Sequence, residues 1–182
     1  MSGSEQLGQA IAACAETWID VPFHWQGRTR AGVDCKGLLA GVLAELGLPA
    51  ALSVEALAGD YDGRVPLARL KAGLARMFDP ADERQAALRQ AQGERIDDGR
   101  MPGDILLCRL RGLAQHLAIA APLPGLPDRA IEAMPSSPGR VRPATWPAAR
   151  VDSVWRLRQG EGKPQVPLHH LAGGPPPPVG EE

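Results

Sequence analysis

The strongest candidate for chemistry in this chain is a cysteine. Cys35 follows Asp34 at the end of a loop rich in Gly and Arg, and an apolar run typical of a helix begins at Leu38. This order predicts that the Cys35 thiol lies at or near a helix N-terminus, where free N–H groups and the positive end of the helix dipole favour a thiolate. Lys36 adds a positive charge beside it. The pattern favours a nucleophilic cysteine, and the competing interpretation is a small buried core residue.

A cysteine nucleophile needs a base within hydrogen-bonding reach, and histidine is a usual choice. Two of the four histidines, His169 and His170, lie in a Gly/Pro-rich tail, where a solvated role is favoured over metal binding. His24 lies in the aromatic stretch just before Cys35, and His116 opens an apolar segment with the character of a strand. The residue types alone leave both His24 and His116 as candidates.

The run Asp34-Cys35-Lys36-Gly37-Leu38 resembles the Asp-Cys-x-Gly-Leu motif that opens the catalytic helix of NlpC/P60 cysteine peptidases. The lead-in at 22–27 is most similar to the branch encoded by phages and gene transfer agents and associated with tail tips. Downstream, residues 103–107 and then His116-Leu117-Ala118-Ile119 match the family's Gly-Asp-hydrophobic strand and the His-headed strand after it. The resemblance covers residues 5 to about 158, is weakest in the middle, and implies that His116 is the base.

Three positions depart from the family's pattern. Phe23 stands where most members have a tyrosine whose hydroxyl lies beside the reacting carbonyl, and Lys36 stands where a small residue is usual. Glu132 takes the place of the polar residue, most often histidine, that orients the base. A carboxylate can accept the imidazole N–H and stabilise the imidazolium, so the resemblance implies a catalytic set of Cys35, His116 and Glu132. The competing interpretation of Glu132 is a solvent-facing side chain on an edge strand.

The residues around the motif are expected to bind substrate. Trp25 and Gln26 are expected to form walls of a groove, together with Phe23. Asp34 is expected to cap the helix or to hold the free amine of the substrate. The Cys35 N–H at the helix start could supply a donor to an oxyanion.

Helices come first in this chain and strands follow, which predicts an α+β fold with an antiparallel sheet; the resemblance implies its papain-like form. Apolar periodicity and turn residues predict helices over 6–19, 35–47, 66–78 and, after an Asp79 cap, 80–92. Strands are predicted over 105–110, 116–121, 129–134, near 141, and over 151–158. We expect one peptidase-like domain over 1–160 with a helical insertion at about 50–99, and a disordered Pro/Gly-rich tail over 161–182.

Composition narrows the remaining classes of protein. The formal net charge is −1, so the sequence lacks the basic excess typical of nucleic-acid-binding proteins. No apolar run reaches the length of a membrane span. Three widely spaced cysteines make neither a disulfide framework nor a metal site, and Cys14 and Cys108 fit apolar patterns that predict core positions. No cofactor is expected, because a thiolate attacks directly. The N-terminus lacks the marks of a signal peptide, so we expect synthesis in a reducing cytosol.

The resemblance implies hydrolysis of amide bonds in peptidoglycan stem peptides, typically between D-γ-glutamate and a diamino acid. It also implies association with a phage or prophage tail particle, with tail-tip proteins as partners. Two alternatives stay open. One is a structural tail-tip or assembly protein of the same fold that has lost activity, which the departures at Phe23, Lys36 and Glu132 motivate. The other is a Cys-His amidase or acyltransferase that acts on a different substrate.

Overall fold

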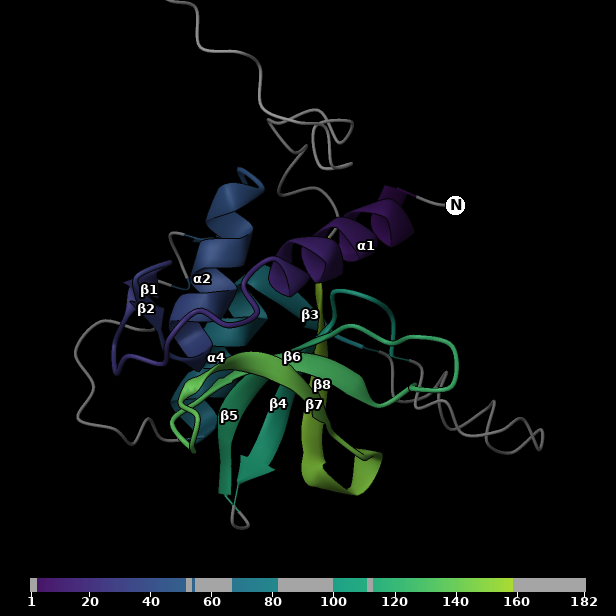
Figure 1. The fold of residues 1–182 in the computed structure, drawn as a ribbon. Coiled ribbons are helices and arrows are strands. Elements are labelled where there is room, and N and C mark those ends of the chain that lie inside the picture. The colour runs from purple at the N-terminus through teal and green to yellow at the C-terminus, as the bar shows by residue number, and fades with distance from the viewer. Residues whose placement is uncertain (1–2, 52–53, 55–66, 82–99, 111–112, 159–182) are drawn as a thin grey trace, which may run out of the picture.

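Helices and strands separate into layers in the computed structural model of this chain (Figure 1). The structure describes residues 3–51, 54, 67–81, 100–110 and 113–158. Its longer helices are α1 (Gly3–Glu16), α2 (Cys35–Glu45) and α4 (Leu67–Met77). The strands are β1 (Arg28–Thr29), β2 (Gly32–Val33), β3 (Phe78–Pro80), β4 (Ile105–Leu110), β5 (Leu113–Ala120), β6 (Arg129–Met134), β7 (Arg140–Thr145) and β8 (Val151–Leu157). A mixed chain with an antiparallel sheet confirms the predicted α+β class.

Six strands form the main sheet in the order β3-β8-β4-β5-β6-β7, and every neighbouring pair is antiparallel. Strands β4 and β6 carry runs of consecutive buried residues, and because successive side chains point to opposite faces, the sheet is buried on both faces there. The larger core lies between the sheet and all three helices, and it includes Ile11, Leu39, Leu74, Ile119 and Ile131. A smaller cluster around Leu106, Ala118, Ala130 and Trp146 covers other sheet positions.

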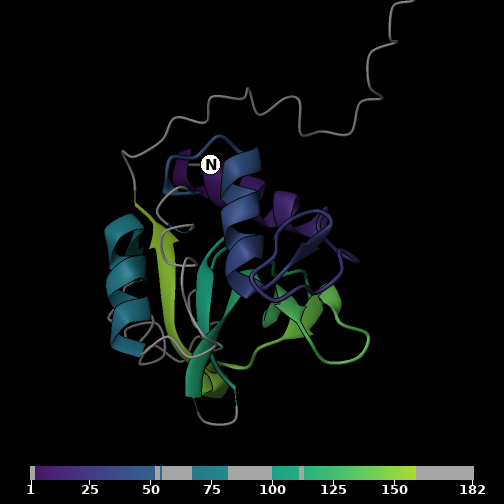
Figure 2. The same cartoon turned by 90° about the vertical axis from the view of Figure 1, so that its left-hand side faces the viewer.

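Close backbone contacts hold α1 to its neighbours. Gly41 on α2 lies against the Trp18 ring, and a Cβ there would come within 2.4 Å of it. Gly8 on α1 lies against the turn before β4, where a Cβ would sit 2.3 Å from Pro102 O. Only glycine allows these approaches. Figure 2 shows α1 and α2 lying together, while α4 stands away from α1 in this view.

One predicted element is wrong at its start. The helix expected over 80–92 was to follow an Asp79 cap, but Phe78–Pro80 forms strand β3, which pairs with β8. The Asp79 carboxylate instead accepts a hydrogen bond from Arg158 Nε at 2.9 Å. Pairing with a strand distant in sequence overrides the local capping signal here. Residues 82–99, and the tail predicted over 161–182, lie outside the described residues.

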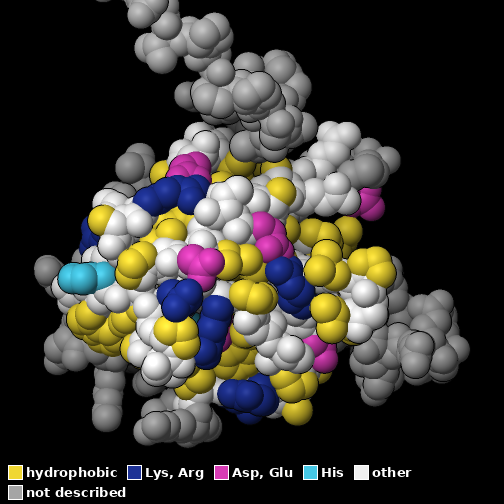
Figure 3. Space-filling model, viewed as in Figure 1, with side chains coloured by type: hydrophobic (Ala, Val, Ile, Leu, Met, Phe, Trp, Pro, Cys, Tyr) yellow, Lys and Arg dark blue, Asp and Glu magenta, His cyan; other side chains and the backbone are white. Residues whose placement is uncertain are grey.

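The remaining differences concern ends and short pieces. Helix α1 ends at Glu16, earlier than expected, and β5 begins at Leu113 instead of His116. The two-residue strands β1 and β2 form a small hairpin that the sequence patterns did not predict. In the described part of the chain, no helix combines the length and apolar character that crossing a bilayer requires. Basic and acidic side chains lie among each other on the face in Figure 3.

Candidate active site

The start of α2 presents Cys35 because Asp34 caps the helix. Asp34 Oδ1 accepts hydrogen bonds from the backbone N–H groups of Lys36 at 3.0 Å and Gly37 at 2.8 Å. Its other oxygen accepts the N–H of Gln26 at 3.1 Å, which ties the lead-in loop to the helix. A short carboxylate at the N-cap satisfies donors that a helix start leaves unpaired. Capping is therefore the role of Asp34 that the geometry displays, and binding of a substrate amine stays a prediction.

The lead-in loop is attached to both sides of the nucleophile. Phe23 N–H donates to Gly139 O at 2.8 Å, next to β7, and His24 N–H donates to Val33 O at 3.0 Å. The loop backbone also lies directly on α2, since a Cβ at Gly37 would come within 1.9 Å of Gly27 O. These contacts fix where Cys35 sits relative to the sheet.

The base candidate and its partner come from neighbouring strands. Ala118 on β5 faces Glu132 on β6, and His116 lies two positions from Ala118 on the same side of its strand. His116 Nε2 is 3.0 Å from Glu132 Oε2, and both side chains are buried. Strand β6 is an interior strand and Glu132 is only 3% exposed, so the solvent-facing alternative for this residue is wrong.

The imidazole of His116 stands between the Glu132 carboxylate and the Cys35 thiol. Burial of the ring lowers its pKa, but hydrogen bonds with Cys35 and Glu132, and their negative charge, outweigh this and raise the pKa of His116 to about 9. Since Nε2 pairs with Glu132, the other nitrogen, Nδ1, is left for the thiol. Cys35 is partly exposed, whereas Cys14 and Cys108 are buried. The arrangement can hold a thiolate beside an imidazolium.

Glu132 is held ionised by three donors. Burial raises the pKa of this carboxyl, but hydrogen bonds and charge from His116, and further hydrogen bonds from Trp146 and Arg142, lower it overall. Trp146 Nε1 donates to Oε2 at 2.9 Å, and Arg142 Nε donates to Oε1 at 3.2 Å. Trp146 and Arg142 were not predicted as site residues from the sequence. Arg142 had a signal, because the β6–β7 hairpin places it opposite Glu132; Trp146, in a loop, had none.

The proposed groove residues lie in the lead-in loop. Trp25 is half exposed, and its ring centroid lies 6.3 Å from that of the partly buried Phe23. Gln26 is exposed and has a left-handed backbone, with φ of 59°. His24 is exposed too, and its Nδ1 lies 3.0 Å from Trp25 O. The structure thus places Phe23, Trp25 and Gln26 on one loop beside the capped helix, and their contact with substrate stays a prediction.

Lys36 differs from its expected setting. It was expected to bring a positive charge to the thiol, and its side chain is buried. Burial lowers the pKa of Lys36, the charges of Cys35 and Asp34 act against this, and Arg69 adds to the lowering. The ammonium therefore interacts electrostatically with Cys35, but it holds its proton less firmly than an exposed lysine does.

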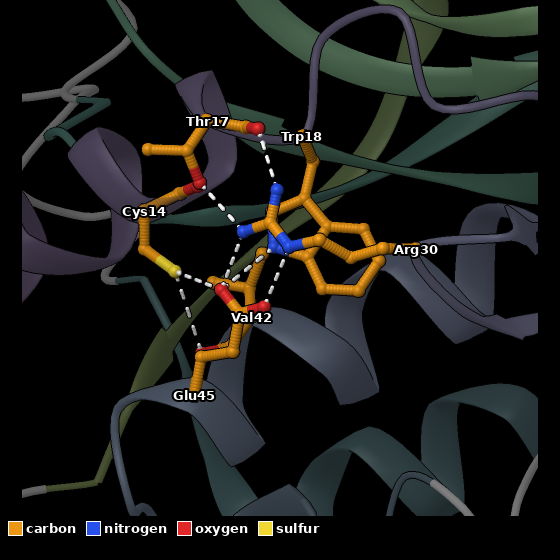
Figure 4. A network of polar contacts seen from close by, with 6 residues as sticks. All are labelled: Cys14, Thr17, Trp18, Arg30, Val42 and Glu45. Carbon is orange, nitrogen blue, oxygen red and sulfur yellow. Dashed lines mark hydrogen bonds and ion pairs between the residues drawn. The ribbon is translucent and has the colours of Figure 1, made fainter. Parts of the chain in front are cut away.

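A second cluster of polar side chains anchors the β1–β2 hairpin that precedes Cys35 (Figure 4). Arg30, at the turn of the hairpin, donates to both oxygens of Glu45 at 2.8 and 2.7 Å and to Thr17 O at 2.6 Å. Its guanidinium lies 4.4 Å from the centroid of the Trp18 ring, and Trp18 Nε1 donates to Glu45 at 3.1 Å. The hairpin is thereby joined to α1 and α2 at the end of α2 that lies away from Cys35.

The other two thiols are in settings that suppress ionisation. Burial and the neighbouring carboxylate of Glu45, 3.4 Å from the sulfur, raise the pKa of Cys14 to about 12. Burial, with the charge of Glu132, also raises the pKa of Cys108. Among the described residues, no group of three or more His, Cys, Asp or Glu side chains could hold a metal ion.

Comparison with known proteins finds similarity in solved structures. An N-acetylmuramoyl-L-alanine amidase from Bacteroides uniformis is 16% identical, with a TM-score of 0.50 over 84% of this chain and 99% of that chain. The NlpC/P60 domain of the peptidoglycan hydrolase SagA is 21% identical, with a TM-score of 0.48 over 82% and 98%. The P60 domain of an antigen from M. avium subspecies paratuberculosis is 16% identical, with a TM-score of 0.46 over 86% and 97%.

No protein-family model matches the sequence, and no curated protein matches it. At these identities the likeness to solved structures concerns the fold. The chain has a papain-like α+β fold, in which a helix that begins at a cysteine packs on an antiparallel sheet that carries a histidine.

Proposed function

We propose that this protein is a cysteine peptidase that hydrolyses amide bonds in peptidoglycan stem peptides, of the type that cuts between D-γ-glutamate and a diamino acid. One observation carries the proposal: the buried His116–Glu132 pair meets the Cys35 side chain at the capped start of α2. The Asp-Cys-x-Gly-Leu resemblance at 34–38 supports the substrate class. The names of two similar structures, an N-acetylmuramoyl-L-alanine amidase and the peptidoglycan hydrolase SagA, support the same substrate class.

In the first half of the proposed reaction, the Cys35 thiolate attacks the carbonyl carbon of the scissile amide. The electron pair of the C=O bond moves to oxygen, and the Cys35 N–H at the helix start is placed to donate to it. Reformation of the carbonyl expels the amine, which takes its proton from the His116 imidazolium. Glu132 keeps the ring oriented throughout. The products are a thioester on Cys35 and a free amine.

In the second half, water attacks the thioester. His116, now neutral, accepts a proton from that water, and the thiolate leaves as the carboxylic acid forms. The thiolate and the imidazolium are regenerated together, so the buried carboxylate faces a cation at the start and end of each cycle. No step in this scheme needs a second nucleophile from the protein.

We extend the proposal to a role at a phage or prophage tail tip. In that role the chain is made in the cytosol, and a tail particle, through its tail-tip proteins, brings it to the cell wall. The similarity of the lead-in at 22–27 to the tail-associated branch is the support for this extension. Detection of the protein in purified tail particles tests it, and its absence from them contradicts it.

Digestion of purified peptidoglycan, read by mass spectrometry, tests the reaction. We expect wild type to release fragments with a new diamino-acid N-terminus, and Cys35→Ala to release none. Cys14→Ala is the matched control, because it removes a thiol remote from His116. Release of whole stem peptides from the glycan would instead identify an amidase. A folded wild type that releases nothing, although Cys35 is alkylated readily, would favour the structural-protein alternative.

A further inference from the structure

Trp146 contacts both partners of the buried ion pair. Its Nε1 donates to Glu132 Oε2, the same oxygen that pairs with His116, and its ring centroid lies 5.5 Å from the imidazole centroid at an interplanar angle of 33°. The indole is 3% exposed. It is thus packed beside the ring that must exchange a proton with Cys35, and hydrogen-bonded to the carboxylate that orients this ring.

The position of Trp146 is itself fixed by charged neighbours. The buried guanidinium of Arg100 donates to Trp146 O at 2.5 Å, and Trp146 N–H donates to Asp128 O at 2.9 Å. Arg150 lies over the indole ring at 4.7 Å from its centroid. A side chain held by its backbone on one side and by a cation on its ring face has little freedom to swing away.

Arg142 completes the set of donors on the other carboxylate oxygen. It lies opposite Glu132 in the β6–β7 register, and its Nε donates to Oε1 at 3.2 Å. Its Nη2 donates to Ser136 Oγ at 3.1 Å, so the guanidinium plane is held at two points. With one oxygen engaged by Arg142 and the other by Trp146, the carboxylate cannot rotate without breaking a hydrogen bond to a charged group.

We propose that Trp146 and Arg142 are positioning residues that fix the rotation of the Glu132 carboxylate, and through it the orientation of the His116 ring toward Cys35. The inference rests on the proposed function, because it assigns these two residues to the same site. Neither side chain is proposed to touch substrate. Both act through Glu132, so the effect of changing either residue should depend on the Glu132 carboxylate. A residue that contributed only packing would not show this dependence.

The test is a double-mutant cycle on the full chain. Trp146→Phe keeps an aromatic ring and removes the N–H, and it is made in wild type and in a Glu132→Gln background. The first readout is the alkylation rate of Cys35 by iodoacetamide at pH 7, which needs no substrate. The second is kcat and KM for a stem peptide. Trp18→Phe is the matched control, because it removes an indole N–H from the carboxylate of Glu45 instead.

We expect Trp146→Phe to lower the alkylation rate and kcat roughly tenfold, with KM nearly unchanged. A tenfold change corresponds to about one pKa unit in the proton equilibrium between the Cys35 thiol and the His116 imidazole. In the Glu132→Gln background the same change should have less than about a twofold effect, since residues that act as a unit are not additive. Trp18→Phe should leave both rates at the wild-type value.

An equal effect of Trp146→Phe in both backgrounds, or no effect in wild type, overturns the inference. If Trp146→Phe does not fold, Arg142→Lys decides by the same cycle: it keeps the charge and loses the planar pair of donors. A fall of about threefold that vanishes with Glu132→Gln supports the inference, and an unchanged rate overturns it. The alkylation rates test the positioning role even if wild type hydrolyses no stem peptide. Absence of hydrolysis by wild type would count only against the proposed function.

Discussion

Two glutamates of this chain accept hydrogen bonds from similar partners but differ in what lies between the carboxylate and the nearest reactive group. Glu45 accepts an indole N–H from Trp18 and a pair of hydrogen bonds from Arg30, and the Cys14 sulfur lies 3.4 Å from its carboxylate. With burial, that carboxylate raises the pKa of Cys14 to about 12. This thiol stays protonated, because a thiolate there would face a carboxylate directly.

Glu132 has the same kinds of donor, an indole N–H from Trp146 and an arginine, Arg142. Here an imidazole lies between the carboxylate and the thiol of Cys35. In the proposed mechanism the ring accepts the proton of the thiol, and its positive charge then lies between two anions. The comparison teaches that the carboxylate alone does not activate a cysteine. At Glu132 the carboxylate faces an imidazole, whereas at Glu45 it faces a thiol directly.

The largest expected effect comes from removing the histidine that pairs with Glu132. His116→Ala should reduce stem-peptide turnover by a factor on the order of 10⁴–10⁶, about as much as Cys35→Ala, since the two residues act as a unit. Steady-state kinetics measure the loss of turnover, and thermal melts check that the variant is folded. Turnover within tenfold of wild type in folded His116→Ala would show that another group serves as base.

The next effect concerns the carboxylate of that cluster. Glu132→Ala should lower kcat by a factor on the order of 10²–10⁴, because the imidazolium loses its acceptor. Glu132→Gln keeps the shape and an acceptor, so it should retain more activity than the Ala variant. Glu132→His restores the arrangement of the resembled family and should stay active. The same turnover assay ranks the variants, and wild-type activity in Glu132→Ala would reduce the site to a Cys35–His116 pair.

The three thiols should differ sharply in reactivity. Iodoacetamide should alkylate Cys35 at least about 10² times faster than Cys14 or Cys108 in the native protein, because the latter two are buried with raised pKa values. Peptide mapping by mass spectrometry after short labelling checks this. Preferential labelling of Cys14 would mean that its cluster, too, supports a thiolate.

Glu45 should matter for stability instead of chemistry. Glu45→Ala removes the acceptor of Arg30 and Trp18 and should lower the free energy of unfolding by about 1–3 kcal/mol, the usual range for groups left without a partner. Turnover below the melting transition should change only a few-fold. Denaturant unfolding and turnover at 25 °C are the measurements. A loss of turnover as large as that of Glu132→Ala would show that the hairpin anchor controls the site.

The smallest expected effect is a pH dependence of stability. The pKa of His116 is raised to about 9 in the folded state, from an ordinary value of 6.5. Its contribution to stability is therefore complete below about pH 6.5 and is lost as the pH rises through about 9. Melts from pH 6 to 10 should fall more steeply for wild type than for His116→Gln. Parallel curves would contradict the raised pKa.

Local patterns in the sequence indicated which residues could bring chemistry. A capping Asp34 before an apolar run marks Cys35, and a strand headed by His116 matches a family order. These signals depend on neighbours in the chain, so they can be read without coordinates. Glu132 was expected on the strand next to that of His116, because the resembled family has its orienting residue there, and the β5–β6 pairing places it on that strand.

The contacts that hold the site residues in place could not be predicted from local sequence patterns. Trp146 meets Glu132 because the chain turns after β7, and nothing in its local sequence gives that distance. Glu45 reads as an ordinary polar residue near a helix end, although it gathers Arg30 and Trp18 from two other elements. Strand β3 forms because β8 is present to pair with it. Each case depends on contacts between segments far apart in the chain.

The segment just before the lead-in loop covers one edge of the sheet. Asp20 N–H donates to Val141 O at 3.0 Å, and Val141 N–H donates to Val21 O at 2.8 Å, so this segment covers the backbone of β7, the last strand on that side. At the opposite edge, β3 is only three residues long and ends in Pro80. Uncovered edges invite pairing between molecules. The segment that leads into the predicted substrate-binding loop therefore also covers a sheet edge, and we expect changes that loosen it to increase aggregation.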